Sequence, residues 1–401
     1  MFIRHLSLTN FRSLNRLELD LTSRLTLLHG ENAQGKTSII EAIHLCSLMT
    51  STIASQDREL VNFLSLGDAQ PFCRIVADIE KEEKPHRLDI RLVVNQNQNG
   101  EQRLLKEFFL DGVKRRFFQM VGFFNSVLFI PQMTRIIEDS PDERRKYLDQ
   151  TLSQAYPGYA RELVEYNKAI SRRNSLLKQL FESGGDEAQL LYWDQIISEK
   201  GAFIIHTRKN AVSALSQLVS HQHNKLTEGR EFLFLKYLPS YYPLIQDTKQ
   251  KRLIDQDVDL PDYDLKQIQE NFFGDLQRGH HQEINRGVTL IGPHRDDLGF
   301  FANEVDLRVY GSRGQVRSAM MSMKLAETLW LQEKSGELPV ILLDETLAEL
   351  DTHRRQQLLN IITDGWQAIF TTADINLFPD DFIERCTVWE VRSGQVLKNN
   401  L

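Results

Sequence analysis

Residues 30–38 read GENAQGKTS and follow the aliphatic run LTLLH. This string has the P-loop spacing GxxxxGK[ST], between a predicted buried strand and a helix predicted to begin near Lys36. The backbone amides of such a loop surround phosphates, and the helix N-terminus adds positive potential. Lys36 is predicted to reach the outer phosphates as a catalytic residue, and Thr37 to offer its hydroxyl to Mg²⁺. The predicted nucleotide-binding residues are Gly30, Glu31, Asn32, Ala33, Gln34, Gly35, Lys36, Thr37 and Ser38.

A P-loop needs a second strand that ends in a carboxylate for the metal. The string PVILLDE supplies one, because four aliphatic residues, 340–343, precede Asp344 and Glu345. Ligand sites in α/β proteins form at the carboxyl ends of such strands. Asp344 is therefore predicted to hold Mg²⁺, directly or through water, and Glu345 to polarise the water that attacks the γ-phosphate of ATP. The alternative is a buried strand that ends in surface acids.

The two motifs are about 300 residues apart, which indicates an insertion and favours an ABC-type ATPase head. Such heads carry a serine-glycine turn before a helix, some thirty residues ahead of the second carboxylate. Here the string is YGSRGQVRSAMMSMKLAE, in which Ser312, Gly314 and Gln315 are predicted to form an anion-binding nest at a helix N-terminus. In the ABC arrangement this nest faces the P-loop of another subunit, so ATP would be bound between two chains. Asp351, at the end of AELD, is predicted to lie in the loop between the two sites of that homodimer.

The elements that position these motifs are predicted from periodicity. Residues 1–130 read mostly as strands, with a two-residue hairpin at Asp111-Gly112, and form the N-terminal part of the head. Residues 131–284 read as a helical arm, with the acidic stretch 246–264 as a surface connection. Residues 285–401 form the C-terminal part of the head, with strand-like patterns in GVTLIG, DLRVY, LPVILL and QAIFTT.

Three helices are predicted in the arm. Ser140-Pro141 begins the first, with Glu143 closing a capping box. The second runs from about Tyr159 to the glycine pair at 184–185, and the third covers about 186–227.

The composition bounds the class of protein. The chain has 401 residues, a net charge of −7 and 41% apolar residues, which is enough for a substantial core in two or three domains. Its three cysteines form no CxxC pair, and no apolar run approaches the ~20 residues of a membrane helix. We therefore expect a cytoplasmic protein with no membrane partner.

Several longer strings resemble the RecF recombination-mediator family over almost the whole chain. They are LTNFRSL, IIEAIHL, LFIPQMTRIIEDSPDERRKYLDQ, YNKAISRRNSLL, GVTLIGPHRDDLGF, YGSRGQVRSAMMSMKLAE and LLDETLAELD. The resemblance implies an α/β fold, an ABC-type P-loop ATPase head with a mixed sheet, a β-rich lobe and an inserted helical arm. It also implies an ATP-driven homodimer that clamps DNA at single-strand gaps or junctions and works with RecO and RecR in loading the recombinase. Slow, DNA-stimulated ATP hydrolysis would release the clamp.

The family pattern leaves other assignments open. Gln132 is predicted to join the metal shell, with an ordinary loop amide as the alternative. ABC heads usually place a γ-phosphate-sensing histidine after the last core strand, where this chain has Thr371, Thr372 and Ala373. The group His294 to Asp297 is predicted to form a structural polar network, with metal ligation as the alternative. Candidate DNA phosphate contacts are the basic clusters 114–116, 144–145 and 172–173, with solvated surface charges as the alternative.

Other functions remain to be separated from this one. A long-armed SMC relative would need hundreds of heptad-patterned residues. An ABC-type ATPase that regulates a partner nuclease would carry an appended nuclease domain, and only about fifty residues follow Asp351. A small-molecule phosphotransferase would need a substrate lid and would not depend on Ser312.

Overall fold

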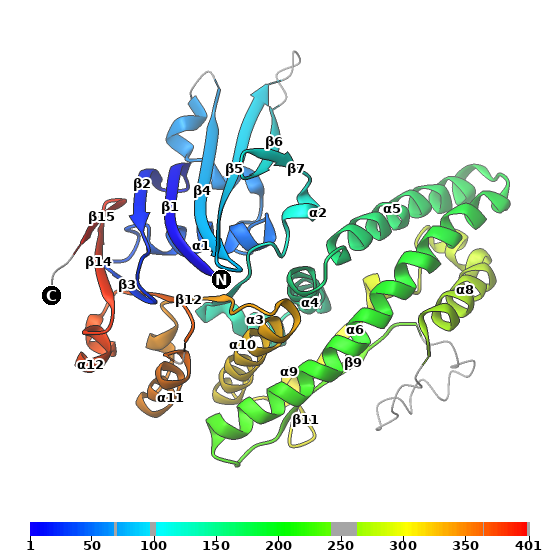
Figure 1. The fold of residues 1–401 in the computed structure, drawn as a ribbon. Helices are drawn as coiled ribbons and strands as arrows, with labels where there is room; N and C mark the ends of the chain where they lie inside the picture. Colours follow the sequence, from blue (N-terminus) through cyan, green and yellow to red (C-terminus); the bar gives the residue numbers. More distant parts are fainter. Residues whose placement is uncertain (68–69, 97–101, 242–262, 364, 399–401) are drawn as a thin grey trace.

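The computed structural model describes residues 1–67, 70–96, 102–241, 263–363 and 365–398. Two sheets form one side of the molecule, and a group of long helices projects from them (Figure 1). Residues 246–262 of the predicted surface connection at 246–264 lie outside the described residues.

An antiparallel sheet forms the β-rich lobe, in the order β2-β1-β4-β5-β6-β7. Apolar residues alternate with polar ones along β1, where Ile3, Leu6 and Leu8 are fully buried. This period of two places one face of the sheet on the core. The strands are β1 (Phe2–Phe11), β2 (Leu14–Asp20), β4 (Phe72–Lys81), β5 (Lys84–Gln96), β6 (Gln102–Leu110) and β7 (Val113–Arg115).

A second, mixed sheet has the order β15-β14-β3-β13-β12-β8. Its pairs are parallel except β14 with β15, and β12 and β13 are buried along their whole length. The continuous aliphatic runs in the sequence reflect this burial on both faces. The strands are β3 (Leu25–His29), β8 (Ser126–Phe129), β12 (Val340–Asp344), β13 (Ala368–Thr372), β14 (Thr387–Arg392) and β15 (Gln395–Lys398).

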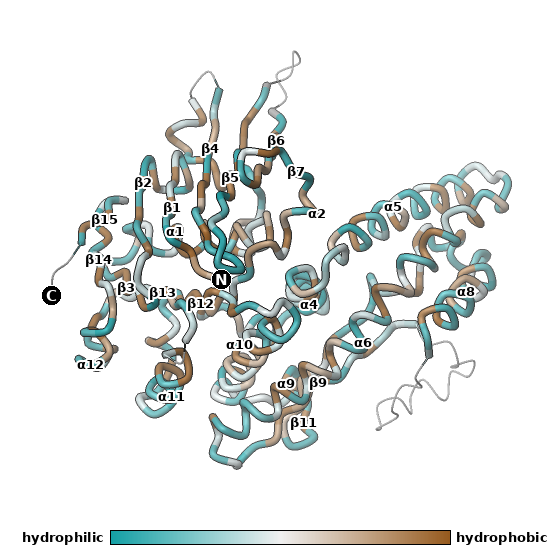
Figure 2. Tube along the Cα trace, in the orientation of Figure 1, coloured by the Kyte–Doolittle hydropathy of each residue, from teal (hydrophilic) through white to brown (hydrophobic). Residues whose placement is uncertain are grey.

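The helices fall into two groups. The arm holds α5 (Tyr159–Ser183), α6 (Leu190–Thr227) and α8 (Leu265–Arg286), which lie side by side in Figure 1 and carry both hydrophilic and hydrophobic stretches in Figure 2. The helices nearer the sheets are α1 (Lys36–Leu48), α2 (Phe117–Met120), α3 (Arg135–Glu138), α4 (Pro141–Ala155), α9 (Leu307–Tyr310), α10 (Arg313–Ser335), α11 (Thr352–Ile362) and α12 (Asp380–Ile383). Short 3-10 turns are η1 (Asp57–Leu60), η2 (Phe63–Gly67), η3 (Pro131–Thr134), η4 (Glu187–Gln189), η5 (Pro293–Arg295), η6 (Thr346–Glu349) and η7 (Ile375–Leu377).

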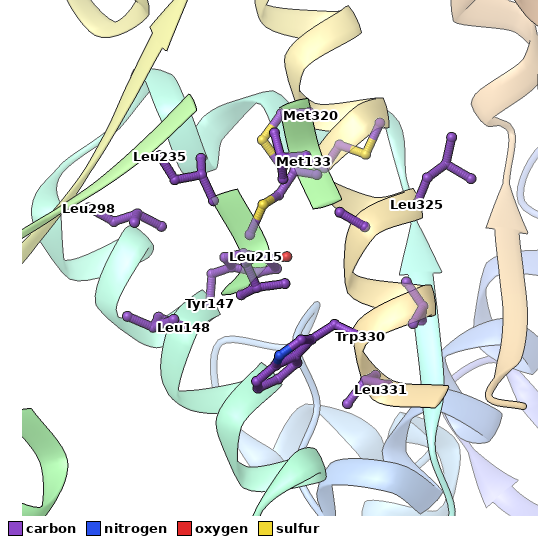
Figure 3. Packing of buried hydrophobic residues seen from close by; sticks show 14 of the residues in the cluster. Met133, Tyr147, Leu148, Leu215, Leu235, Leu298, Met320, Leu325, Trp330 and Leu331 are labelled. Carbon is purple, nitrogen blue, oxygen red and sulfur yellow. The ribbon is translucent and has the colours of Figure 1, made fainter. Parts of the chain in front are cut away.

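A single apolar cluster joins the base of the arm to the head. Figure 3 shows Trp330 and Met320 of α10 facing Tyr147 and Leu148 of α4 and Leu215 of α6. All of these side chains are buried. Because one core spans these three helices, α10 is fixed in position relative to both the arm and the mixed sheet.

Several predicted elements are confirmed. Asp111 and Gly112 have φ of 52° and 78° and join β6 to β7, with Leu110 opposite Val113. The second arm helix ends at Gly184 as predicted. The third begins at Leu190, after η4, and ends at Thr227. Pro141 begins α4, but the predicted capping box is wrong, because the Ser140 side chain makes no cap hydrogen bond.

The strand predictions for GVTLIG and DLRVY are wrong. Residues 287–292 form turns, and 307–310 form α9. A small sheet that the sequence did not predict has the order β11-β10-β9, from β9 (Leu233–Leu238), β10 (Asp297–Ala302) and β11 (Val305–Asp306). This pairing joins residues on both sides of position 284, the boundary predicted between arm and head. The division into 1–130, 131–284 and 285–401 stays a prediction.

Among the described residues, no helix combines the length and the apolar character that crossing a bilayer requires.

Candidate nucleotide site

The P-loop connects β3 to α1 and depends on two glycines. Gly30 and Gly35 have φ of 156° and 107°. A Cβ on Gly30 would lie 2.3 Å from the carbonyl oxygen of Val391, and a Cβ on Gly35 would lie 2.7 Å from a methyl carbon of Leu14. The chain itself therefore requires glycine at both positions.

Lys36 lies inside the loop and is only 4% exposed. Its Nζ donates hydrogen bonds to the backbone oxygens of Gly30 (2.7 Å) and Glu31 (2.9 Å) and forms an ion pair with Oε1 of Glu345 (3.1 Å). This places the ammonium group at the centre of the loop, and its contact with the outer phosphates stays a prediction. The other predicted loop residues surround it, with Glu31, Asn32, Ala33 and Thr37 exposed and Gln34 and Ser38 half-buried.

Asp344 lies at the end of β12 and joins the two motifs. Its carboxylate accepts hydrogen bonds from the hydroxyls of Thr37 (2.8 Å) and Thr371 (2.6 Å). Burial raises the pKa of this carboxyl, and the nearby negative charge of Glu345 raises it further. A divalent cation would stabilise the ionised form. The hydroxyl and carboxylate oxygens at this point are the ligand types that Mg²⁺ prefers, so the residues fit the metal.

The position of Glu345 is set by contacts with Thr371 and Ala373, in and just after β13. Its backbone is left-handed, with φ of 51°, and its N–H lies 3.1 Å from Oγ1 of Thr371. Its Oε2 accepts a hydrogen bond from the N–H of Ala373 (3.1 Å), while Oε1 faces Lys36. Glu345 thus stands beside both Asp344, the predicted metal ligand, and the P-loop lysine, which is the position a general base needs.

Two contacts in the site were not predicted from the sequence. In the sequence, Thr371 stands out only because it occupies the position where ABC heads usually have a sensing histidine. In the structure, its hydroxyl donates to Asp344 and accepts from the N–H of Glu345. The turn between β14 and β15 contacts the P-loop, because the N–H groups of Ser393 and Gly394 donate to the side chain and backbone oxygens of Gln34 (2.5 and 3.1 Å). The dipeptide Ser-Gly between two strand patterns was the available signal for this turn.

Gln132 lies in η3, three residues beyond the end of β8, and is exposed. Strand β8 is the neighbour of β12, with Phe129 opposite Leu343, and the hydroxyl of Thr346 donates to the carbonyl of Phe129 (2.9 Å). Gln132 therefore follows the strand next to Asp344, and its place in the metal shell stays a prediction.

The predicted signature forms the start of α10. The Ser312 side chain accepts from the N–H of Gln315 (3.3 Å), and the Gln315 side chain accepts from the N–H of Ser312 (3.0 Å), a complete capping box. Gln315 also donates to Glu231 (3.1 Å), and a Cβ on Gly314 would meet nothing within 4 Å. Among the described residues, no hydrogen bond or ion pair joins 312–315 to residues 30–37. The structure does not bring these two predicted halves together within one chain.

Asp351 caps α11, since its side chain accepts from the N–H of Arg354 (3.0 Å), and that bond lowers the pKa of its carboxyl. It is exposed, and Glu349 just before it forms an ion pair with Arg317 of α10. The loop after Glu345 is thus tied to the signature helix. The role of Asp351 between two sites stays a prediction.

The polar group at 294–297 forms the network that the sequence favoured. The His294 ring bonds the hydroxyl of Tyr166 (2.7 Å), and burial lowers the pKa of this histidine to about 4. Asp296 accepts from Tyr237 and from the buried Arg208. These contacts join α5, α6 and β9, so this group fixes the base of the arm.

Two candidate DNA contacts are wrong for this structure. Arg144 is buried and its Nε donates to Asp297 (2.6 Å). Arg173 is fully buried between Asp194 (2.8 Å) and Glu283 (2.6 Å). A guanidinium whose charge is paired inside the protein cannot contact a DNA phosphate. Arg172 and residues 114–116 are exposed, so these candidates stand.

Comparisons with known proteins find relatives that match almost the whole chain. The model of the RecF/RecN/SMC N terminal domain matches residues 2–384. The DNA replication and repair protein RecF of Roseiflexus castenholzii is 36% identical over 99% of both chains. The protein of that name from Halalkalibacterium halodurans is 33% identical over 99% of this chain and all of its own. A solved structure of the recombination mediator protein RecF with ATP, in the RecFOR pathway, has a TM-score of 0.83 and 30% identity, and covers 99% of this chain and 97% of its own.

These matches confirm the predicted fold class, an α/β ABC-type ATPase head with a mixed sheet and a helical arm.

Proposed function

The chain belongs to the RecF family. We propose that it is an ATP-dependent DNA-binding protein of recombinational repair and that it acts in the RecFOR pathway, as its structural relative does. ATP binding would drive formation of a homodimer that clamps DNA at gaps or junctions and helps RecO and RecR load the recombinase. The observation that carries the proposal is the divided site: Lys36, Thr37, Asp344 and Glu345 are assembled in one chain, while Ser312 and Gln315 are not joined to them.

The divided site gives a physical basis for gating. A ligand shifts an equilibrium only through its different affinity for the two states. If ATP contacts the P-loop of one chain and the signature of another, it binds the dimer more tightly than the monomer. A DNA-binding surface that needs two chains is then present only while ATP is bound.

The same contacts suggest how hydrolysis proceeds. Lys36 would leave the carbonyls of Gly30 and Glu31 to bind the outer phosphate oxygens. Glu345 would then lose its ion pair with Lys36 and orient the attacking water from its anchor on Ala373. Thr37 and Asp344 would hold Mg²⁺, which would supply positive charge to stabilise the phosphate oxygens. Because this change requires existing contacts to be exchanged, we expect slow turnover. DNA that binds only the ATP-bound dimer would favour the state in which the site is complete, so we expect DNA to stimulate hydrolysis.

The proposal is tested by trapping the dimer. Glu345→Gln removes the base but keeps an amide that can accept from Ala373, so this variant is expected to accumulate as an ATP-bound dimer on gapped DNA. Sedimentation with ATP, Mg²⁺ and gapped DNA measures that dimer. Glu333→Gln, an exposed glutamate on α10, is the matched control and should behave as the unchanged protein. A Glu345→Gln protein that stays monomeric at saturating ATP would contradict the clamp.

A further inference from the structure

Two small apolar surfaces flank the two halves of the divided site. The lobe patch consists of Phe63 and Leu64, which are 73% and 70% exposed. The signature patch consists of Val309 and Tyr310, which are 66% and 76% exposed. Neighbouring large apolar side chains left in water to this extent mark interaction surfaces more often than single exposed residues do.

The lobe patch lies beside the P-loop through the turn between β1 and β2. The N–H of Asn62 donates to the carbonyl of Asn10, near the end of β1 and just before that turn (2.8 Å). Just after the turn, at the start of β2, Leu14 lies so close to Gly35 that a Cβ there would meet it at 2.7 Å. The region around this turn therefore contacts the segment that carries the lobe patch on one side and the P-loop on the other.

The signature patch ends α9, two residues before the cap of α10 at Ser312. The N–H of Gly311 donates to the carbonyl of Leu307 (3.2 Å), which ends α9 directly before that cap. Phe232, which is also exposed, follows Glu231, the residue that binds the Gln315 side chain. Exposed apolar side chains thus lie close in sequence both to Ser312 and to the residue that binds Gln315.

We propose that the two patches are one interface: in the ATP-bound dimer, Phe63 and Leu64 of one protomer pack against Val309 and Tyr310 of a second copy of this chain. This inference rests on the proposed dimer and names the contacts that build it. When a two-fold axis places each P-loop opposite a signature, the surface beside one faces the surface beside the other, twice. Side chains that are exposed in the monomer and buried only in the dimer stabilise the dimer that ATP favours. They also restrict the two protomers to one relative orientation.

A third apolar surface provides an internal control. Phe181, Leu191 and Tyr192 are also exposed, but they lie where α5 ends and α6 begins, at the far end of the arm from both sheets (Figure 1). They border neither the P-loop nor the signature. A charge placed at Phe181 should therefore leave the ATP-dependent dimer unchanged.

Charge substitutions test the interface. Leu64→Asp and Tyr310→Asp are each expected to weaken ATP-dependent dimerisation about 10-fold or more, because each buries a carboxylate against an apolar surface. Binding of a fluorescent ATP analogue to the monomer should be unchanged, which shows that the P-loop is intact. Phe181→Asp is the matched control. Equal dimerisation constants for Tyr310→Asp and Phe181→Asp would overturn the inference.

A disulfide test separates this inference from the proposed function. Leu64→Cys and Tyr310→Cys are combined in a chain in which Cys386, the cysteine that is not fully buried, is replaced by serine. With a nonhydrolysable ATP analogue, mild oxidation is expected to link two chains, and neither single cysteine should do so. Sedimentation that shows the dimer without this link, or a link from Leu64→Cys alone, would overturn the interface and leave the clamp standing. Absence of any analogue-dependent dimer would overturn both.

Discussion

The glycines of the P-loop and of the signature show how differently the two halves of the site are built. Gly30 and Gly35 are enclosed by their own chain, since a Cβ on either would overlap Val391 or Leu14. Gly314 has open space around it. The first half is assembled within the monomer, with Lys36 paired to Glu345 and Asp344 hydrogen-bonded to Thr37. The second half has its own hydrogen bonds satisfied and keeps a free surface, which is what a group needs if its partner arrives from another molecule.

The largest effect is expected in the P-loop half. Lys36→Arg should lower ATP hydrolysis by about 100-fold or more while ATP still binds, since Lys36 is buried inside the loop and a larger, planar guanidinium cannot place its charge on the outer phosphate oxygens as the compact ammonium would. Steady-state ATPase assays and a fluorescent nucleotide measure the two properties. Lys334→Arg, at the end of α10, is the control. Hydrolysis within a few-fold of the unchanged protein would show that this half is not the catalytic one.

The signature half is tested without loss of its helix cap. Aspartate and asparagine are both good caps, so Ser312→Asp and Ser312→Asn should fold with similar stability. The aspartate would repel the γ-phosphate, and we expect it to lower dimer-dependent hydrolysis by roughly 30-fold, with the asparagine much closer to the unchanged protein. Thermal unfolding and ATPase assays compare the pair. Equal turnover in both variants would argue against an anion at this nest.

Mixing variants tests whether the halves come from different chains. A dimer of Lys36→Arg with Ser312→Asp has one site with both defects and one site with none, if each site takes its P-loop and signature from different chains. We therefore expect the mixture to regain hydrolysis that neither variant has alone. If each site were formed within one chain, the mixture would not regain hydrolysis. That result would show that the P-loop and the signature of one site belong to the same chain.

A smaller effect is expected from the buried carboxylate. Because burial raises the pKa of Asp344, the folded chain binds its proton more tightly than the unfolded chain does, so this group lowers stability as pH rises above the ordinary pKa of 3.8. Asp344→Asn removes that cost. In the absence of metal we expect its Tm to exceed that of the unchanged protein by about 2–4 °C at pH 7, and the gap to narrow towards pH 5.

Mg²⁺ should reverse this difference. It is expected to raise the Tm of the unchanged protein and not that of Asp344→Asn, because only the carboxylate offers it a charge. A gap in Tm that is the same at pH 5 and pH 8, and insensitive to Mg²⁺, would show that Asp344 is not the charge responsible.

The smallest effect concerns the open glycine. Gly314→Ala places a methyl group in free space within α10, so the monomer should gain about 0.5–1 kcal/mol of stability. The same methyl group would occupy space that the γ-phosphate of ATP bound to a second chain approaches. The rate of ATP hydrolysis should therefore fall. Chemical denaturation and ATPase assays measure the two changes. Gain in stability with full hydrolysis would mean that no ligand approaches this position closely.

Much of this molecule was predictable because its signals are local. The P-loop is a strand, a glycine turn and a helix within one short segment, and Asp344 follows an unbroken aliphatic run. The capping box at Ser312 likewise needs only two residues three positions apart, Ser312 and Gln315. By contrast, residues 287–292 (GVTLIG) and 307–310 (LRVY) have strand-like composition but form no strand in the structure, and β9 becomes a strand because β10 lies beside it. Short apolar runs carry too little information to decide this without the partner.

The kinds of groups at the site and their order along the chain follow from local sequence, because turn chemistry and strand ends are set by neighbouring residues. Which charges are enclosed and which are free depends instead on tertiary packing. This packing pairs Arg144 with Asp297 and Arg173 with Asp194 and Glu283. It also brings Thr371 within hydrogen-bonding distance of Asp344 and leaves Ser312 exposed. The physical reason is that burial and ion pairing depend on segments far apart in sequence, whose approach is set by the packing of the whole core.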